Sequence, residues 1–111
     1  MDDSDVTIQI QEERGGRPPA VDPGHVRIRR GQTVAWENRT NGRSRVCFPR
    51  GDLFEGGDRP VVDVGPDDRS RPVRVREDLE RGRVPYAVFL RRSDHSFDVA
   101  EGGSHPMMII L

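Results

Sequence analysis

The sequence contains no lysine, so all 18 of its basic residues are arginines. The 19 acidic residues balance them and leave a formal net charge of −1. A balanced chain has no bulk electrostatic attraction for nucleic acid or for an anionic membrane surface. We therefore expect neither nucleic acid nor a membrane among its partners.

Long hydrophobic runs are also absent. No stretch reaches the roughly 18 apolar residues of a membrane-spanning helix, and the opening MDDSDVTIQI lacks the positive and apolar regions of a secretory signal. The single cysteine, Cys47, cannot form an internal disulfide, which is typical of a reducing compartment. We expect a cytoplasmic protein with one domain, residues 1–111, and a disordered tail at residues 1–4.

The sequence shows no Cys-His dyad and no nucleophile motif. Arg45 and Arg50 could lower the pKa of the Cys47 thiol and make it a redox-responsive or metal-binding group. A partly exposed thiol without a role is the favoured interpretation. We therefore expect a protein that is not an enzyme.

Helical periodicity is missing as well, because no window of about 11 residues carries apolar residues at i, i+3, i+4 and i+7. Instead, Val6, Ile8 and Ile10 alternate with polar residues. The same alternation occurs at 26–29, 34–37 and 73–76. Turn sequences rich in Gly and Pro separate these runs. This pattern predicts seven or eight short antiparallel strands in an all-β sandwich or barrel.

Two segments are apolar on both faces. The run VPYAVFL, residues 84–90, is typical of a central strand, and MMIIL, residues 107–111, is expected to be its equally buried neighbour.

The strand pattern resembles a known family. The segment PGHVRIRRGQTVAWENRTNGRSRVCF resembles the front half of the cupredoxins, the small blue-copper sandwiches, with Gly31, Val34, Trp36 and Asn38 at the family's spacing. GPDDRSRPVRVREDLERGRVPYAVFL resembles the section that delivers the copper cysteine, and GGSHPMMIIL the ligand loop and closing strand. The resemblance implies an all-β, cupredoxin-like Greek-key β-sandwich of seven to eight strands.

The resemblance also implies where copper ligands would lie. A blue-copper site needs two imidazoles, a thiolate and a weak axial thioether. Ser44 stands at the first histidine position and Leu90 at the cysteine position, and neither supplies such a ligand. Cys47 is out of phase with Val46 and Phe48, so it should point away from the core. We expect no blue-copper centre and no cofactor.

The remaining ligand positions leave an alternative open. His95 or His105 could match the second histidine, and Met107 or Met108 the methionine. A noncanonical copper site would use His95, His105 and Met107. The favoured interpretation is that methionine packs in the core and the histidines lie in a solvated loop. Met107 and Met108 should point to opposite faces of a strand, so both sulfurs cannot reach one ion without a bulge.

Two polar loops are the best candidates for contact with a partner. RRSDHSFDVAEGGSHP is long and polar, and the family's architecture brings it to the same end of the sandwich as NRTNGRSR. The expected contact residues are Arg43, Ser44, Arg45, Asp94, His95, Phe97 and His105. We expect a non-enzymatic interaction or scaffold module whose partner is another protein or, through an open sheet edge, a second copy. The alternative is a copper-binding or electron-transfer protein.

Arginines on several strands could form a basic face for an acidic partner. They are Arg27, Arg29, Arg43, Arg45, Arg74 and Arg76. The favoured alternative is a solvated sheet face with cross-strand ion pairs, in which Glu37 lies beside Arg74 or Arg76.

Overall fold

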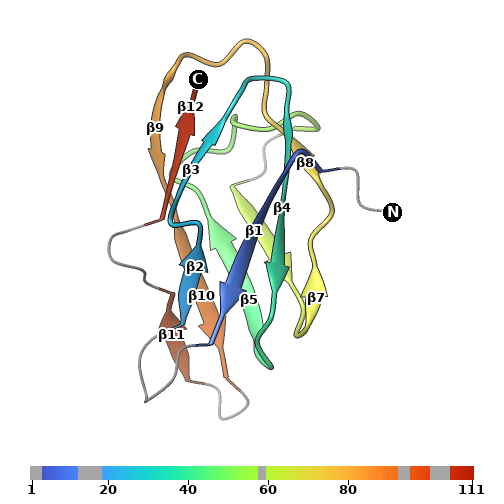
Figure 1. The fold of residues 1–111 in the computed structure, drawn as a ribbon, viewed down its shortest axis with the longest axis vertical. Coiled ribbons are helices and arrows are strands. Elements are labelled where there is room, and N and C mark those ends of the chain that lie inside the picture. The colour runs from blue at the N-terminus through green and yellow to red at the C-terminus, as the bar shows by residue number, and fades with distance from the viewer. Residues whose placement is uncertain (1–3, 13–18, 58–59, 93–95, 101–105) are drawn as a thin grey trace.

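The computed structural model describes residues 4–12, 19–57, 60–92, 96–100 and 106–111 (Figure 1). These residues form twelve strands, and none of them is in a helix that is long and apolar enough to span a membrane. The strands are β1 (Val6–Gln11), β2 (Ala20–Asp22), β3 (His25–Ile28), β4 (Thr33–Asn38), β5 (Arg43–Cys47), β6 (Val61–Val64), β7 (Asp68–Arg69), β8 (Val73–Arg74), β9 (Gly82–Pro85), β10 (Ala87–Arg91), β11 (Phe97–Val99) and β12 (Met107–Ile110).

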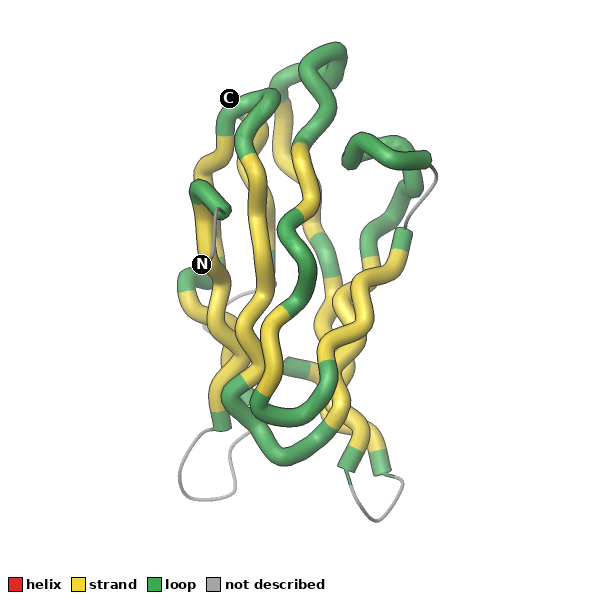
Figure 2. The backbone as a smooth tube through the Cα atoms, turned by 90° about the vertical axis from the view of Figure 1, so that its right-hand side faces the viewer, coloured by secondary structure: helices red, strands yellow, loops and turns green. Residues whose placement is uncertain are grey.

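The strands form three sheets. One has the order β2-β1-β4-β7, with β8 also paired to β4; the second has the order β11-β10-β5-β6; the third has the order β3-β12-β9. The strands run along the long axis of a body that measures 41 × 28 × 24 Å, and the turns gather at its two ends (Figure 2). The predicted all-β sandwich is confirmed.

The pairing differs from the expectation in one respect. The β1–β4 and β3–β12 pairs are parallel, and the other pairs are antiparallel. The parallel pairing of β1 and β4 is possible because β2 and β3 carry the chain back along the sandwich between them (Figure 1).

The run at residues 84–90 is divided between two sheets. Val84 pairs with Met108 of β12, whereas Val88 pairs with Val46 of β5. The division falls at Tyr86, whose amide donates to the carbonyl of Pro106. The number of strands exceeds the predicted seven to eight for two reasons. Some runs are divided into two strands, as here, and β11 lies in a segment that we expected to be a loop.

The closing strand β12 is buried on one face only. Met108 and Ile110 lie in the core beside Val84, as expected. Met107 and Ile109 are half-buried on the outer face, so the expectation that both faces are equally buried is wrong. The outer face lacks a covering layer among the described residues, and this explains the difference.

Trp36 lies at the centre of the core. Its ring centroid is 5.6 Å from that of Phe48, 6.0 Å from that of Tyr86 and 6.5 Å from that of Phe54. All three pairs are edge-to-face, a geometry that aromatic rings prefer. Within the part of the chain that the structure describes, neither the Trp36 Nε1 nor the Tyr86 hydroxyl has a hydrogen-bond partner that meets the usual distance and angle limits. Burial raises the pKa of Tyr86 to about 12, and the neighbouring indole N–H offsets part of this effect.

Candidate functional site

The loop between β4 and β5 is held by the buried side chain of Asn38. Its Nδ2 donates to the carbonyls of Gly42 (2.8 Å), Gly65 (3.0 Å) and Val64 (3.3 Å). Its Oδ1 accepts from the amide of Thr40 (3.0 Å) and from the Thr40 hydroxyl (2.7 Å). Asn38 therefore ties two turns together at one end of the sandwich, and its buried polar atoms are satisfied.

Gly42 allows this loop to pack against the end of β10. A Cβ at Gly42 would lie 2.4 Å from the Arg91 carbonyl oxygen and 3.1 Å from Leu90 Cδ1. A side chain at this position would force the backbones apart. The close approach brings the start of β5 beside the end of β10, where the resemblance places two copper ligands.

Ser44 and Leu90 are direct partners in the β5–β10 pair. Both lie inside the sandwich: Ser44 is 2% exposed and Leu90 is fully buried. The Ser44 hydroxyl points to the Val64 carbonyl oxygen at 3.4 Å. A hydroxyl and an alkyl group supply neither the imidazole nor the thiolate that a blue-copper ion needs, so these two residues do not fit the metal.

The alternative metal ligands are only partly within the described residues. Met107 lies on the outer face of β12 and Met108 in the core, so the prediction that they point to opposite faces is confirmed. His95 and His105 lie outside the described residues. Within the ranges that the structure describes, no three His, Cys, Asp or Glu side chains are grouped so that they could hold a metal ion.

The outer face of β5 and β10 carries a groove of about 590 Å³. Its lining residues are Arg43, Ser44, Arg45, Cys47, Asp63, Phe89 and Arg91. Phe89 lies opposite Arg45 in the register, and Arg45 Nε donates to Asp63 Oδ1 at 2.8 Å. The groove thus combines an aromatic ring with arginine side chains.

The structure describes the side chains of three of the residues that we expected to contact a partner, and all three line the outer groove. Arg43 and Arg45 are exposed on the outer face, as the expected surface requires. Ser44 belongs to the inner face, because side chains alternate along a strand. Its hydroxyl points to the Val64 carbonyl oxygen, although Ser44 is also among the residues that line the outer groove, and the contact role of Arg43, Ser44 and Arg45 stays a prediction. Asp94, His95 and His105 lie outside the described residues, as does the side chain of Phe97.

Sequence reasoning missed Phe89, Asp63 and Arg91. The sequence places Phe89 in a strand that is apolar on both faces, and such a strand gives no sign that one face is open. The signal lay in its position between Val88 and Leu90, because residues adjacent to two inward side chains must point outward.

Cys47 lies on the outer face of β5, as its phase in the strand predicts, and it is half-buried. Burial raises the pKa of the Cys47 thiol, and Asp63 adds to this effect, whereas Arg45 opposes it more weakly than burial. The idea that flanking arginines activate this thiol is therefore wrong, because desolvation of the thiolate dominates.

The predicted cross-strand ion pairs have other partners. Glu37 lies opposite Arg69, with 3.7 Å between Arg69 Nη1 and Glu37 Oε2, and not beside Arg74 or Arg76. Arg74 pairs with Glu55 (3.6 Å) instead. The reason is the strand order, which places β7 beside the end of β4 that carries Glu37.

Comparison with known proteins gives a match in structure alone: no protein-family model and no curated protein matches the sequence. A reduced Cu(I) form of an amicyanin mutant at pH 4 is similar with a TM-score of 0.59 and 15% identity, covering 100% of this chain and 85% of that one. Amicyanin from Paracoccus versutus has a TM-score of 0.58 and 20% identity, covering 98% and 82%. A purple cupredoxin from Nitrosopumilus maritimus has a TM-score of 0.55 and 18% identity, covering 96% and 100%.

The fold is cupredoxin-like. The similarity spans nearly the whole chain, so it confirms the architecture that the resemblance in the sequence implied. At these identities the similarity concerns the backbone, and the side chains at the ligand positions decide the chemistry.

Proposed function

We propose that the chain is a non-enzymatic interaction or scaffold module of cupredoxin-like fold without a blue-copper centre. The observation that carries the proposal is the Ser44–Leu90 pair, which fills the inner face of β5 and β10 with groups that do not bind copper. A redox role of the blue-copper type needs the thiolate that Leu90 replaces.

The outer groove supports a partner that is a protein. Val99 lies opposite Phe89 and is 41% exposed, and Val61 lies opposite Cys47 and is 40% exposed. Val99 extends the apolar surface of Phe89 onto β11, and Val61 adds an apolar side chain on β6. The exposed Arg45–Asp63 ion pair lies beside Phe89 in the same row. Apolar surface bordered by arginine is typical of protein interfaces.

The other parts of the proposal concern location and partner class. The proposed partner is a protein, which includes a second copy of the chain, and nucleic acid and membranes are not proposed partners. The net charge of −1 supports this choice. The proposed location is the cytoplasm, and cell fractionation with an antibody against the chain tests it. Sedimentation equilibrium at high concentration tests whether the partner is a second copy.

A copper titration tests the absence of a blue-copper centre. Protein purified without chelator is mixed with Cu(II), and its visible absorption is recorded. We expect no intense band at about 600 nm, because that band arises from charge transfer between a thiolate and copper. Such a band, accompanied by one copper per chain in elemental analysis, would overturn the proposal.

Site-specific cross-linking tests the groove. A photo-reactive amino acid replaces Arg43 in one variant and Arg71, which is exposed and makes no ion pair with described residues, in a control. A protein partner that uses the groove should cross-link from position 43 and not from position 71. Equal cross-linking from both positions would contradict use of the groove.

A second candidate function is noncanonical copper binding or electron transfer through His95, His105 and Met107. The position of Met107 on the outer face of β12 favours this second function, because its thioether is not packed in the core and is free to bind a metal ion. The similar structures also include a Cu(I) amicyanin. Competition for Cu(I) against a chromogenic chelator separates the candidates. Copper retained by the wild type and lost in a H95A/H105A variant would favour this second function.

A further inference from the structure

The arginines that the structure describes differ in whether they lie near a carboxylate. Seven of these 15 arginines lie within 4 Å of a carboxylate, and they are Arg39, Arg45, Arg50, Arg69, Arg74, Arg76 and Arg92. Four others, Arg27, Arg29, Arg81 and Arg83, are exposed and form no ion pair with any residue that the structure describes. What sets these four apart is their place, because Arg27 and Arg29 flank β12 on one side and Arg81 and Arg83 flank it on the other.

The three-stranded sheet brings these four arginines together. β12 is the middle strand, and its outward residues Met107, Ile109 and Leu111 form an apolar stripe. Ile109 lies opposite Arg27 of β3 on one side and opposite Arg83 of β9 on the other. Arg29 follows the end of β3 and Arg81 precedes β9, so two exposed arginines flank the stripe on each side. We call the four arginines and the stripe the arginine face.

A cleft of about 680 Å³ opens at the upper end of the arginine face. Its lining residues are Arg29, Arg30, Arg81, Ile110 and Leu111, and no carboxylate side chain is among them. Arg30 is anchored there, because its Nη1 donates to the Leu79 carbonyl at 3.2 Å. Leu111 is 44% exposed. The cleft therefore joins positive charge to exposed apolar surface.

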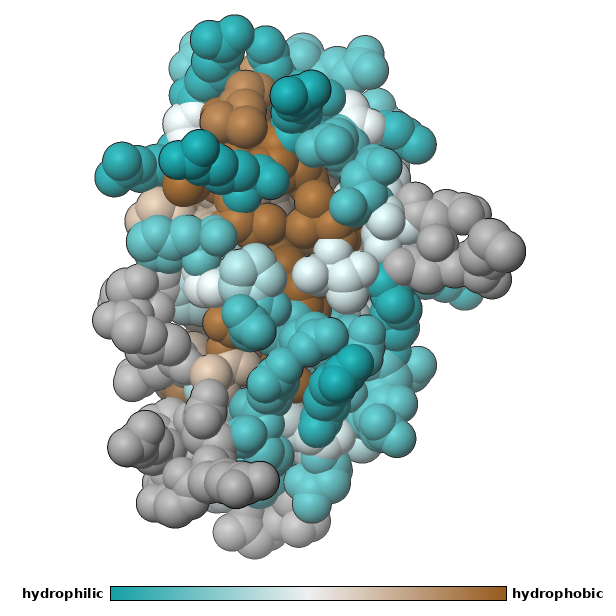
Figure 3. All heavy atoms as spheres, viewed as in Figure 1, coloured by the Kyte–Doolittle hydropathy of each residue, from teal (hydrophilic) through white to brown (hydrophobic). Residues whose placement is uncertain are grey.

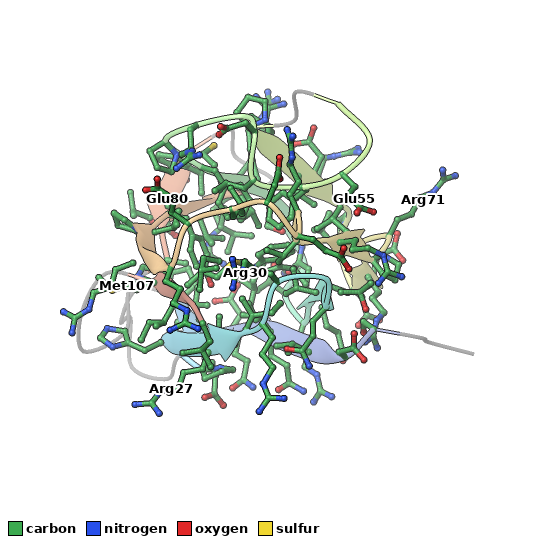
Figure 4. All side chains as sticks on the ribbon, turned by 90° about the horizontal axis from the view of Figure 1, so that it is seen from above. Arg27, Arg30, Glu55, Arg71, Glu80 and Met107 are labelled. Atoms are coloured by element: carbon green, nitrogen blue, oxygen red, sulfur yellow. The ribbon has the colours of Figure 1, made fainter. Side chains whose placement is uncertain are left out.

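The pictures show the same arrangement. Hydrophobic atoms are visible between hydrophilic side chains over the upper part of β3 and β12 (Figure 3). Seen from above, the labelled Arg27 and Met107 lie on the same side of the molecule, and Arg71 extends from the opposite side (Figure 4).

We propose that the arginine face docks an acidic segment of a partner protein. Carboxylates of the segment bind the guanidinium groups of Arg27, Arg29, Arg81 and Arg83, and its apolar side chains cover the stripe. Charge complementarity selects an acidic occupant, and arginine binds carboxylate in a bidentate geometry. The stripe is one strand wide and bordered by charge on both sides, which fits a single extended segment and not the broad insertion into a lipid surface. This site lies on a different sheet from the β5–β10 groove, so it goes beyond the proposed function.

A labelled peptide tests the proposal. The probe is a fluorescein-labelled peptide in which Asp and Glu alternate with Leu and Val, and its binding is followed by fluorescence anisotropy. We expect saturable binding to the wild type that falls about tenfold or more in the R27E/R83E variant, because like charges replace attraction. The control R71E should change the affinity by about twofold or less, since an exposed, distant charge contributes little. A matched peptide with Asn and Gln in place of Asp and Glu should not bind.

Three other results would overturn the proposal. No saturable binding by the wild type, or equal losses in R27E/R83E and R71E, shows that the arginine face is not a specific site. Binding to phosphatidylserine vesicles that depends on Arg27 and Arg83, without peptide binding, assigns the face to a membrane. A dimer that R27E/R83E dissociates assigns it to a second copy.

The two sites can be distinguished in the same experiment. Loss of peptide binding in R43E/R91E, with R27E/R83E unaffected, moves the acidic segment to the groove and leaves the proposed function intact. Conversely, a blue-copper band in the copper titration removes the proposed function without affecting the peptide measurement.

Discussion

Adjacent residues on β5 and β10 point to opposite faces of the sheet, and the side chains on the two faces differ in chemistry. On the inner face, Ser44 and Leu90 meet as partners and are closed off by the core. On the outer face, Arg45 and Phe89 meet in the same register and line an open groove. The comparison shows that a strand pair can present a hydroxyl and an alkyl group to the core and charged and aromatic side chains to the surface, so the proposed loss of copper binding and the proposed partner site concern opposite faces of the same strands.

The largest expected effect distinguishes the two faces of β10 directly. Leu90→Ala should lower the free energy of unfolding by about 3 to 4 kcal/mol, because it leaves a cavity in a fully buried position. Phe89→Ala should cost about 1 kcal/mol, since its ring lies at the surface of the groove. Urea denaturation measures both. If both variants lost the same free energy of unfolding, the inner and outer side chains of β10 would contribute equally to stability, which would contradict this assignment of faces.

A smaller effect is expected at the loop that supports the inner face. Asn38→Ala should lower the free energy of unfolding by about 2 to 3 kcal/mol, because it removes a buried amide that donates to the carbonyls of Gly42, Val64 and Gly65 and accepts from Thr40. Thr40→Val removes the hydroxyl that bonds to Asn38 Oδ1 and to the backbone of Gly42 but keeps the side-chain volume, and it should cost about 1 to 2 kcal/mol. If Asn38→Ala were as stable as the wild type, Asn38 would not hold this end of the sandwich.

Much of the fold could be predicted from the sequence, because alternation is a local signal. Val34 and Trp36 point inward as their spacing requires, and so do Val46 and Phe48. The mismatch of Ser44 and Leu90 with copper ligation was also visible, since both positions follow from the strand pattern. These features depend on the period of a strand and not on which strands are neighbours.

Features that depend on strand neighbours could not be predicted. Glu37 pairs with Arg69 because β7 lies beside β4, and the arginine face exists because β12 lies between β3 and β9. The sequence shows where the arginines are, but it does not show which of them form an ion pair with an acidic side chain. The division of residues 84–90 between two sheets is a further case, because it depends on contacts of β12 at a distance in sequence.

Ionisation of Tyr86, on the inner side, gives a spectroscopic comparison. Tyr86 is the only tyrosine, so ultraviolet absorption reports its ionisation without ambiguity. Burial raises its pKa from 10.0 to about 12, which means that the folded state holds the neutral phenol. The resulting stabilisation is present below pH 10 and is lost as the pH rises toward 12. A titration midpoint near the ordinary value in the folded protein would show that Tyr86 is not buried.

The smallest effect is expected at Cys47 on the outer side. Because the pKa of its thiol is raised, less thiolate is present at a given pH, and iodoacetamide should react more slowly with the folded protein than with the unfolded chain. Asp63→Asn should increase the rate modestly, since the Asp63 carboxylate raises this pKa. A faster reaction in the folded state would indicate an activated thiol.

The inner face of β5 and β10 can be tested most directly by X-ray diffraction from crystals soaked in copper, with data collected at the copper absorption edge. The account predicts no anomalous peak beside Ser44 and Leu90, because neither side chain offers a ligand. A copper ion bonded to side chains at this end of the sandwich would contradict it.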